Sequence, residues 1–388
     1  MEPPDTELPT ARTLEPLPLP LPAPTLQLPA ELLGLVFNYV PLSSLPTLAV
    51  VNRVFYAEAT RRMYHTVNLS SQTLSPSGFS SQERGIASLS ASRELCKHVR
   101  SFRYSLPRLS QRSSTSSTAT ADRLRLILSH MDNLRALHLE NAPMDILHGS
   151  KFSLVSLHID FSTLATDQER EHDAGELGTW LSRQRSLTSL RLVNCDSLSV
   201  TDSNCLPALS EIAASAAIVT ALVPFRPVKS VSMTLGKMDE ARTTPSRLMA
   251  ALSRSAVALN ALELDLTAGE LPYNVYLQAA ATRLQHLQTL SVSGTHRALE
   301  QLFRHIHHIL LPLTELHTIR MMARPQVPHN HEAEFARVKI WYKLCPSLRL
   351  LQFPSRVEWI VTVDAQALTP KVDKREPEAG GLQRLRVR

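Results

Sequence analysis

Histidine is the residue type in this chain whose spacing comes nearest to that of a chemical site. His305 and His308 share one face if their segment is helical, a spacing that two metal ligands can use. The neighbouring candidates are His307, His329, His331, Glu332 and Glu334. No cysteine or carboxylate completes a ligand set around the first group. We therefore interpret these histidines as structural or solvated and expect no metal ion.

Other residue types give no catalytic constellation. Cys195 and Cys205 are ten residues apart with no accompanying histidine motif, so a catalytic thiol is not predicted. The chain lacks a Gly-x-Gly-x-x-Gly loop, a phosphate loop and a Gly-x-Ser-x-Gly elbow, and it has only 11 glycines. We expect no catalytic residue and no cofactor, and thus a protein that is not an enzyme.

The elements that would position any binding residues follow one recurring pattern, apolar-x-x-apolar-x-apolar. Its occurrences begin at Val99, Leu134, Leu154, Leu187, Val228, Leu259, Leu287, Leu316 and Leu348, with a tenth candidate at Leu382. Successive starts are 20 to 41 residues apart, and helix-like stretches lie between them. Strands that alternate with helices at one period indicate a solenoid. The units resemble divergent leucine-rich repeats, which implies a parallel sheet with outer helices.

The period of two along a strand assigns each side chain of a unit to one face of the sheet. The last two apolar residues of each unit should point into the core, and the residue between them should point to the open face. That middle position is polar and varied, as in a recognition surface, and the alternative is a face that is merely solvated. The predicted substrate-binding residues are Arg103, His138, His158, Arg191, Glu263 and Arg320.

Residues 28–64 form the most informative stretch of the chain. Leu-Pro opens it, and an apolar stripe at helical spacing runs from Leu32 to Val40. Pro41 ends this segment because a proline disfavours helix at the preceding residue. A second short apolar helix follows. A third, which Asn52 can cap, carries Phe55 and Tyr56.

The order Leu-Pro-x-Glu-Leu-Leu, Phe-x-Tyr-Val, Leu-x-x-Leu and Val-Asn-Arg-x-Phe-Tyr resembles the F-box consensus, especially its fungal versions. Two positions depart from it: Ser44 stands where many F-boxes carry aspartate, and Phe55 where many carry tryptophan. The resemblance implies binding to a Skp-type adaptor and, through it, to a cullin. The adaptor-binding residues it implies are Leu28, Pro29, Glu31, Leu32, Phe37, Leu45, Leu48 and Val51.

We therefore predict an α/β protein with three parts. Residues 1–25 would be a disordered proline-rich leader, for which an SH3- or WW-type ligand is the alternative. Residues 26–70 would be a three-helix F-box. Residues 71–388 would be an irregular solenoid with a Ser/Arg-rich loop near 105–121.

Composition agrees with a protein that works inside the cell. Apolar residues make up 43% of the 388, the net charge is +6 and there are 4 cysteines without metal spacing, which favours a reducing compartment. No run of 18 apolar residues and no signal peptide is found, so we expect no membrane contact and a cytoplasmic or nuclear location.

These features predict the substrate-recognition subunit of a Skp–cullin–F-box ubiquitin ligase, with an unknown protein as its substrate. One alternative is a repeat scaffold that does not join a ligase. Another is a nucleic-acid-associated protein, because Lys97–Arg125 is rich in arginine. Aromatic residues are only 5% of the chain, so nucleic acid is the less favoured partner.

Overall fold

The computed structural model describes residues 29–70, 81–105, 114–162, 167–198, 205–235, 244–266, 273–325, 328, 330–363 and 370–375. The chain divides into two compact units, Met1–Arg62 and Met63–Arg388. The predicted leader, Leu28 and the tenth repeat candidate at Leu382 lie outside the described residues.

The first unit is helical. Its elements are α1 (Ala30–Tyr39), the 3-10 turn η1 (Leu42–Ser44), α2 (Leu45–Ala49) and α3 (Arg53–Tyr64), whose last two residues lie beyond the boundary. Val40 is extended before Pro41, as expected for a residue that precedes proline. Asn52 accepts a hydrogen bond from the backbone N–H of Phe55 at 2.8 Å and so caps α3.

The core of this unit is small. Leu33, Phe37, Leu45 and Ala59 are its buried apolar residues, and the Phe37 ring meets Phe55 edge-on with centroids 5.4 Å apart. A Cβ atom on Gly34 would lie 3.1 Å from the Glu58 carboxylate, so α1 and α3 approach closely at this point. Most other apolar side chains of the unit remain outside the core.

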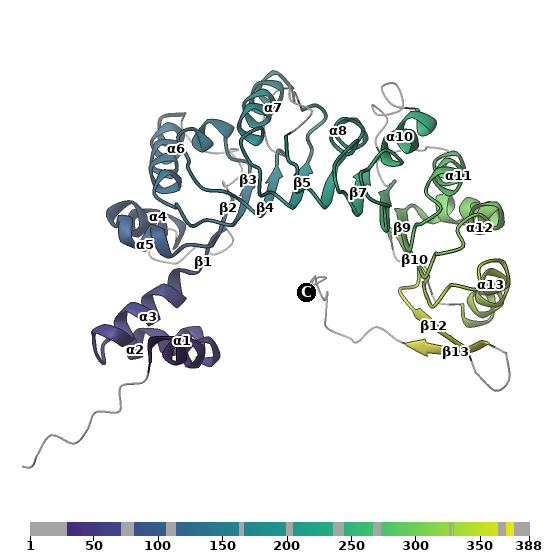
Figure 1. Cartoon of the computed structure of the whole chain (residues 1–388), viewed down its shortest axis with the longest axis horizontal. Coiled ribbons are helices and arrows are strands. Elements are labelled where there is room, and N and C mark those ends of the chain that lie inside the picture. Colours follow the sequence, from purple (N-terminus) through teal and green to yellow (C-terminus); the bar gives the residue numbers. More distant parts are fainter. Residues whose placement is uncertain are drawn as a thin grey trace, which may run out of the picture. The chain divides into compact units, whose positions relative to one another are not determined.

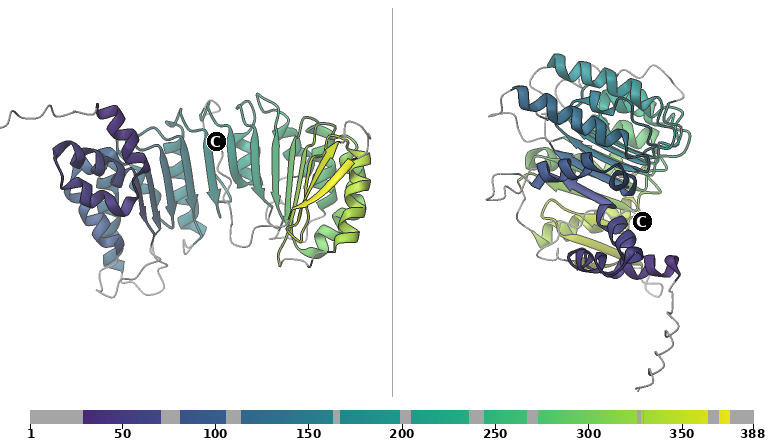
Figure 2. Two further views of the ribbon diagram at one scale, coloured as in Figure 1. Left: turned by 90° about the horizontal axis from the view of Figure 1, so that it is seen from below. Right: turned by 90° about the vertical axis from the view of Figure 1, so that its left-hand side faces the viewer.

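The second unit is built on one sheet of thirteen strands whose spatial order follows the sequence. The strands are β1 (Thr66–Leu69), β2 (Ser101–Ser105), β3 (Ala136–Glu140), β4 (Ser156–Asp160), β5 (Ser189–Val193), β6 (Glu211–Ser215), β7 (Ser230–Thr234), β8 (Ala261–Asp265), β9 (Thr289–Gly294), β10 (Thr318–Ala323), β11 (Leu350–Gln352), β12 (Glu358–Val363) and β13 (Pro370–Arg375). Strands β1–β11 are parallel, and β12 and β13 close the end as an antiparallel pair. The strands stand side by side in Figure 2.

Helices connect most of the strands. They are α4 (Ser81–Ala91), α5 (Arg93–His98), α6 (Ser114–Ser129), the 3-10 turn η2 (Met144–Leu147), α7 (Asp167–Leu181), α8 (Ala216–Leu222), α10 (Pro245–Leu252), α11 (Tyr273–Arg283), α12 (His296–Leu310) and α13 (His331–Leu344). Figure 1 shows the helices from α6 to α13 together on one side of the sheet. This is the predicted solenoid with a parallel sheet and outer helices, so the fold class is confirmed.

The strand register confirms the predicted alternation of faces. The second apolar residue of each repeat is buried, and these residues pair with one another across neighbouring strands. The residues predicted for this position were Leu137, Leu157, Leu190, Leu262 and Leu290. They belong to one continuous apolar core that extends from Leu69 to Val361.

Three local features differ from the sequence prediction. Strand β6 fills the 41-residue gap before Val228; it was missed because its inward pair is Ile212 and the small Ala214. Strand β1 (Thr66–Leu69) pairs with β2 and is part of the sheet, although the sequence prediction placed these residues in the three-helix part at 26–70. The Ser/Arg-rich loop predicted near 105–121 is helical in its second half, because α6 begins at Ser114.

Aromatic side chains close the C-terminal end of the solenoid. Trp341 stacks on Phe353 at 5.3 Å, and Phe303 lies 5.8 Å from Trp341. The buried Trp359 donates its indole N–H to the Glu334 carboxylate at 3.0 Å. Terminal repeats need such a cap because no further repeat covers their apolar face.

Within the described ranges, no single helix has the length and apolar character to cross a bilayer. Two consecutive helical segments, Glu31–Tyr39 and Leu42–Ala49, are long and apolar enough when taken together, but the chain bends by 116° between them.

Candidate functional site

The first candidate site is an exposed apolar face on the helical unit. Nine of the fourteen exposed large apolar side chains in the described residues lie on its few turns. Tyr39 is 90% exposed and Val50 is 83% exposed. The members of this apolar face are Leu32, Leu35, Val36, Tyr39, Leu42, Val50, Val51, Val54 and Tyr56. Such a concentration of exposed apolar surface is typical of a protein–protein interface.

The structure separates the eight predicted adaptor-binding residues into surface and core. Pro29, Glu31, Leu32 and Val51 are exposed, and Leu48 is half-buried. Leu28 lies outside the described residues.

Two of the eight residues do not lie on the surface of the unit. Phe37 is 1% exposed and Leu45 is 0% exposed, so both belong to the core of the helical unit and present no surface. Phe37 lies about one turn after Leu33 on the inward side of α1, whereas Leu32, Leu35 and Val36 point outward.

Sequence reasoning missed several members of the apolar face, notably Leu35, Tyr39, Leu42 and Val54. A signal was present in the sequence. The apolar residues of α1 cover most of its circumference, and a helix that is apolar nearly all round needs more partners than one small core provides.

The second candidate site is the middle row of the open sheet face. Strand pairing aligns Arg103, His138, His158 and Arg191 on four adjacent strands, β2–β5. The small residues Ala213 and Ser232 continue the row on β6 and β7, as their pairing with neighbouring strands shows. Glu263 on β8 and Arg320 on β10 lie further along the same row. The six predicted residues therefore share one face but form two charged groups.

The group on β2–β5 is tied together by polar contacts. Arg103 forms an ion pair with Glu140, and His138 Nε2 lies 2.7 Å from Glu140 Oε1. The rings of His138 and His158 are 3.9 Å apart at their centroids, with 49° between their planes.

The two imidazoles are neutral at physiological pH. Burial, followed by the nearby Arg103 guanidinium, lowers the pKa of His138. Burial, then the fields of His138 and Arg191, lower the pKa of His158 to about 4.

The carboxylate beside them is ionised. Burial alone would raise the pKa of Glu140, but hydrogen bonds from Ser105 and Arg103 outweigh burial and lower it. At neutral pH the fixed charges of the group are therefore carried by arginine and carboxylate side chains.

Asparagine turns border this group at the C-terminal ends of the strands. Asn141 and Asn194 follow β3 and β5 with φ of 61° and 56°, a conformation that asparagine tolerates better than most residues. The Asn194 side-chain amide donates to Asp160 Oδ1 at 2.9 Å, and Asp160 Oδ1 also accepts from the Ser162 N–H at 2.9 Å.

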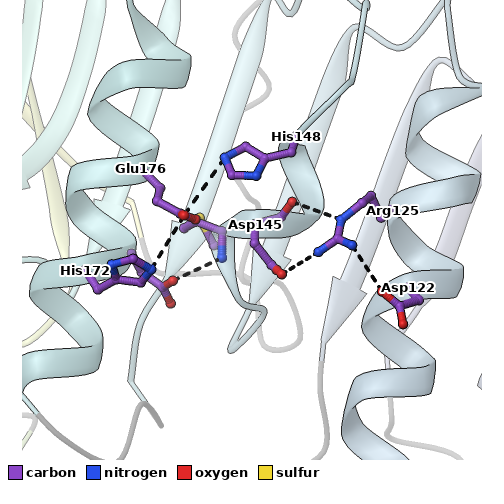
Figure 3. Close-up of polar contacts among 8 residues, drawn as sticks. Asp122, Arg125, Asp145, His148, His172 and Glu176 are labelled. Atoms are coloured by element: carbon purple, nitrogen blue, oxygen red, sulfur yellow. Dashed lines mark hydrogen bonds and ion pairs between the residues drawn. The ribbon is translucent and has the colours of Figure 1, made fainter.

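A further polar cluster lies among α6, η2 and α7 (Figure 3). Arg125 pairs with Asp145, and its Nε donates to the Asp145 carbonyl at 3.3 Å. His172 Nε2 and His148 Nε2 lie 3.5 Å and 4.0 Å from Glu176 Oε1. These contacts link neighbouring helical elements of the solenoid.

The histidines near residues 305–331 do not come together in one site within the described part of the chain. His305, His307 and His308 are exposed on α12, His331 begins α13, and His329 is outside the described residues. No group of three or more His, Cys, Asp or Glu side chains in the described ranges is arranged to hold a metal ion.

The thiols are buried. All four cysteines are free and buried, and burial raises the pKa of Cys195 to about 12. A protonated, buried thiol is a poor nucleophile.

Comparison with known families identifies the helical unit. The F-box domain model matches residues 25–62. This unit is an F-box domain. The match covers α1, α2 and most of α3, so the F-box presents the exposed apolar face described above.

F-box domains generally bind Skp-type adaptors, and this chain joins one to a solenoid of strand–helix repeats. No curated protein matches the sequence. Among solved structures, the leucine-rich repeat-containing protein LegL7 from Legionella pneumophila is similar, at 18% identity over 82% of this chain and 86% of that chain, with a TM-score of 0.35. The repeat architecture of this chain follows from its own sheet topology.

Proposed function

We propose that this F-box protein is the substrate-recognition subunit of a Skp–cullin–F-box ubiquitin ligase. The F-box match at residues 25–62 carries the proposal. In it, the apolar face of the F-box binds the Skp-type adaptor, the adaptor brings the cullin, and the open face of the solenoid binds a protein substrate.

The exposed apolar face supports the adaptor part of the proposal. Isolated exposed apolar residues are ordinary on protein surfaces, but nine within one short helical unit are not. Burying them against a partner would stabilise the complex by removing apolar area from water.

The solenoid supports the substrate part. Its parallel strands present one long row of side chains, and repeat proteins commonly use such extended surfaces for binding. Ubiquitin transfer would be carried out by the partners and not by this chain. We expect the assembly to work in the cytoplasm or nucleus, where the four free thiols would stay reduced.

Co-purification with a Skp-type adaptor tests the proposal. Val36→Asp places a charge on the apolar face, at a side chain that is 52% exposed and lies outside the core of the helical unit. We expect this variant to lose most of the adaptor recovered by the wild-type chain, because a buried unpaired carboxylate opposes association.

A matched control is available on the solenoid. Ile340 on α13 is 56% exposed, so Ile340→Asp introduces the same charge at a similar exposure outside the F-box. Adaptor recovery should be unchanged in this control. Wild-type recovery by Val36→Asp, or no recovery by the wild-type chain, would contradict the ligase proposal, and the second result would favour the non-ligase scaffold.

The arginine-rich stretch gives the nucleic-acid alternative less support than its composition suggests. Lys97 pairs with Glu94 at 2.6 Å, and Arg103 pairs with Glu140. Arg125 is held by acidic partners on α6 and η2. Because these charges are already matched within the protein, they are less available to phosphates.

A further inference from the structure

The charged group on β2–β5 has an asymmetric border. Two residues before each member of the row, on the same face, stand the small residues Ser101, Ala136, Ser156 and Ser189. Two residues after the central members stand Glu140 and Asp160. One side of the row is therefore a shelf of small side chains, and the other side is acidic.

The acidic side is already satisfied within the protein. Glu140 is engaged by Arg103 and His138, and Asp160 accepts from Asn194 and Ser162. These contacts match the Arg103 charge and leave the carboxylates little capacity for a ligand.

The opposite is true of Arg191. Its side chain is exposed, and within the described part of the chain it has no ion pair or hydrogen bond. The side-chain hydroxyls of Ser156 and Ser189, beside it on the shelf, are likewise unengaged among the described residues. Arg191 nevertheless lies close enough to both imidazoles to lower their pKa values.

We propose that the Arg103–His138–His158–Arg191 row binds an anionic side chain, a carboxylate or a phosphate, on a segment of the protein substrate, with Arg191 as the principal contact. This inference rests on the proposed function and adds the chemical class of what the open face recognises. The anion would lie on the shelf between His158 and Arg191.

The geometry suits such a group. Neighbouring strands are about 4.8 Å apart, so the side chains of His158 and Arg191 can both reach the oxygens of one small anion. A guanidinium donates two parallel hydrogen bonds to a carboxylate or phosphate, and the serine hydroxyls provide further donors. The small shelf residues leave the row open to the chain that carries the anion.

The imidazoles couple this binding to pH. The charged groups that face them are Arg103, Glu140, Asp160 and Arg191, together with the other ring. In the free protein both pKa values are lowered, and a bound anion would raise them. Binding would then take up a proton, so affinity for a carboxylate that stays ionised should increase as the pH falls below about 6.5, the ordinary pKa of histidine, towards about 5.

Fluorescence anisotropy of the full chain with short fluorescein-labelled peptides tests the inference. Three peptides alternate glycine with glutamate, with phosphoserine or with glutamine. We expect the glutamate peptide, the phosphoserine peptide or both to bind at least about ten-fold more tightly than the glutamine peptide. The comparison of the two acidic peptides tells which anion the row prefers.

Arg191→Gln should weaken acidic-peptide binding by about ten-fold or more, because one charge-assisted contact is lost. The matched control is Arg183→Gln, which removes the same charge from an exposed position after α7, away from the strands. In the double variant H138Q/H158Q the increase in affinity for the glutamate peptide at low pH should disappear, whereas the phosphoserine peptide titrates by itself at about pH 6 and is not used for this test.

Three results would overturn the inference: acidic peptides that bind no better than the glutamine peptide, binding unchanged in Arg191→Gln, or a pH dependence of glutamate-peptide binding that persists in H138Q/H158Q. The adaptor test is independent, because it uses the F-box and its apolar face. If the chain binds the adaptor but does not bind acidic peptides, only this inference is refuted. If it binds acidic peptides through Arg191 but does not bind the adaptor, the ligase proposal is refuted and the anion-binding row remains.

Discussion

At the scale of single residues, one helical turn of the F-box separates the core from the exposed apolar face. Leu33 and Phe37 point inward from α1, whereas Leu35 and Val36, also apolar, remain in solvent. Phe37 also contacts Phe55 on α3 and thus links two helices of a very small core. Such a core has few other contacts to compensate for a lost ring.

Phe37→Ala should destabilise the F-box by about 3–5 kcal/mol, as expected for removing a fully buried aromatic side chain. Leu35→Ala, at an exposed position, should change stability by less than about 0.5 kcal/mol. Hydrogen exchange of peptides from α1 and α3, followed by mass spectrometry, measures both. Equal protection in the two variants would show that Phe37 is not part of the core.

At the scale of elements, each strand of the solenoid contributes one face to the core and one to solvent. Leu262 and Glu263 are neighbours on β8, yet Leu262 is buried and Glu263 is on the open face. Strand β6 obeys the same alternation with Ile212 and the smaller Ala214. The pattern that places the core therefore also places the candidate binding row.

Leu262→Ala should lower the free energy of unfolding by about 2–5 kcal/mol, because it leaves a cavity in the continuous core. Glu263→Ala, one residue along the same strand, should change it by about 0.5 kcal/mol or less. Urea unfolding monitored by tryptophan fluorescence compares the two. Similar losses in both variants would be inconsistent with the observed alternation of faces.

At the scale of the whole molecule, the chain comprises two compact units with separate cores. The F-box core is formed by residues such as Leu33, Phe37 and Leu45, and the solenoid core begins at Leu69. Trp180, Trp341 and Trp359, the three tryptophans of the chain, all lie in the solenoid, so their fluorescence reports on that unit alone.

We expect the two units to lose structure independently. Leu262→Ala should shift the unfolding transition seen by tryptophan fluorescence and leave hydrogen exchange in α1 unchanged, because Leu262 and the residues of α1 belong to different cores. Phe37→Ala should do the reverse. A common shift of both signals in either variant would mean that the units fold as one cooperative block.

The amino-acid sequence by itself determined the alternation of faces and the row of Arg103, His138, His158 and Arg191, because both follow from the period of two along a strand. It also determined the F-box, because the order of apolar residues and prolines there is specific.

Only the tertiary structure decided which apolar residues of α1 are core, since that depends on where α3 and α2 pack and not on the stripe alone. It also supplied β6, whose small Ala214 gives a weak sequence pattern but which pairs with β5 on one side and β7 on the other. The tertiary structure also decided which charges of the Arg103–His138–His158–Arg191 row are paired within the protein. Glu140 and Asp160 find their partners on neighbouring strands and turns, which leaves Arg191 unmatched.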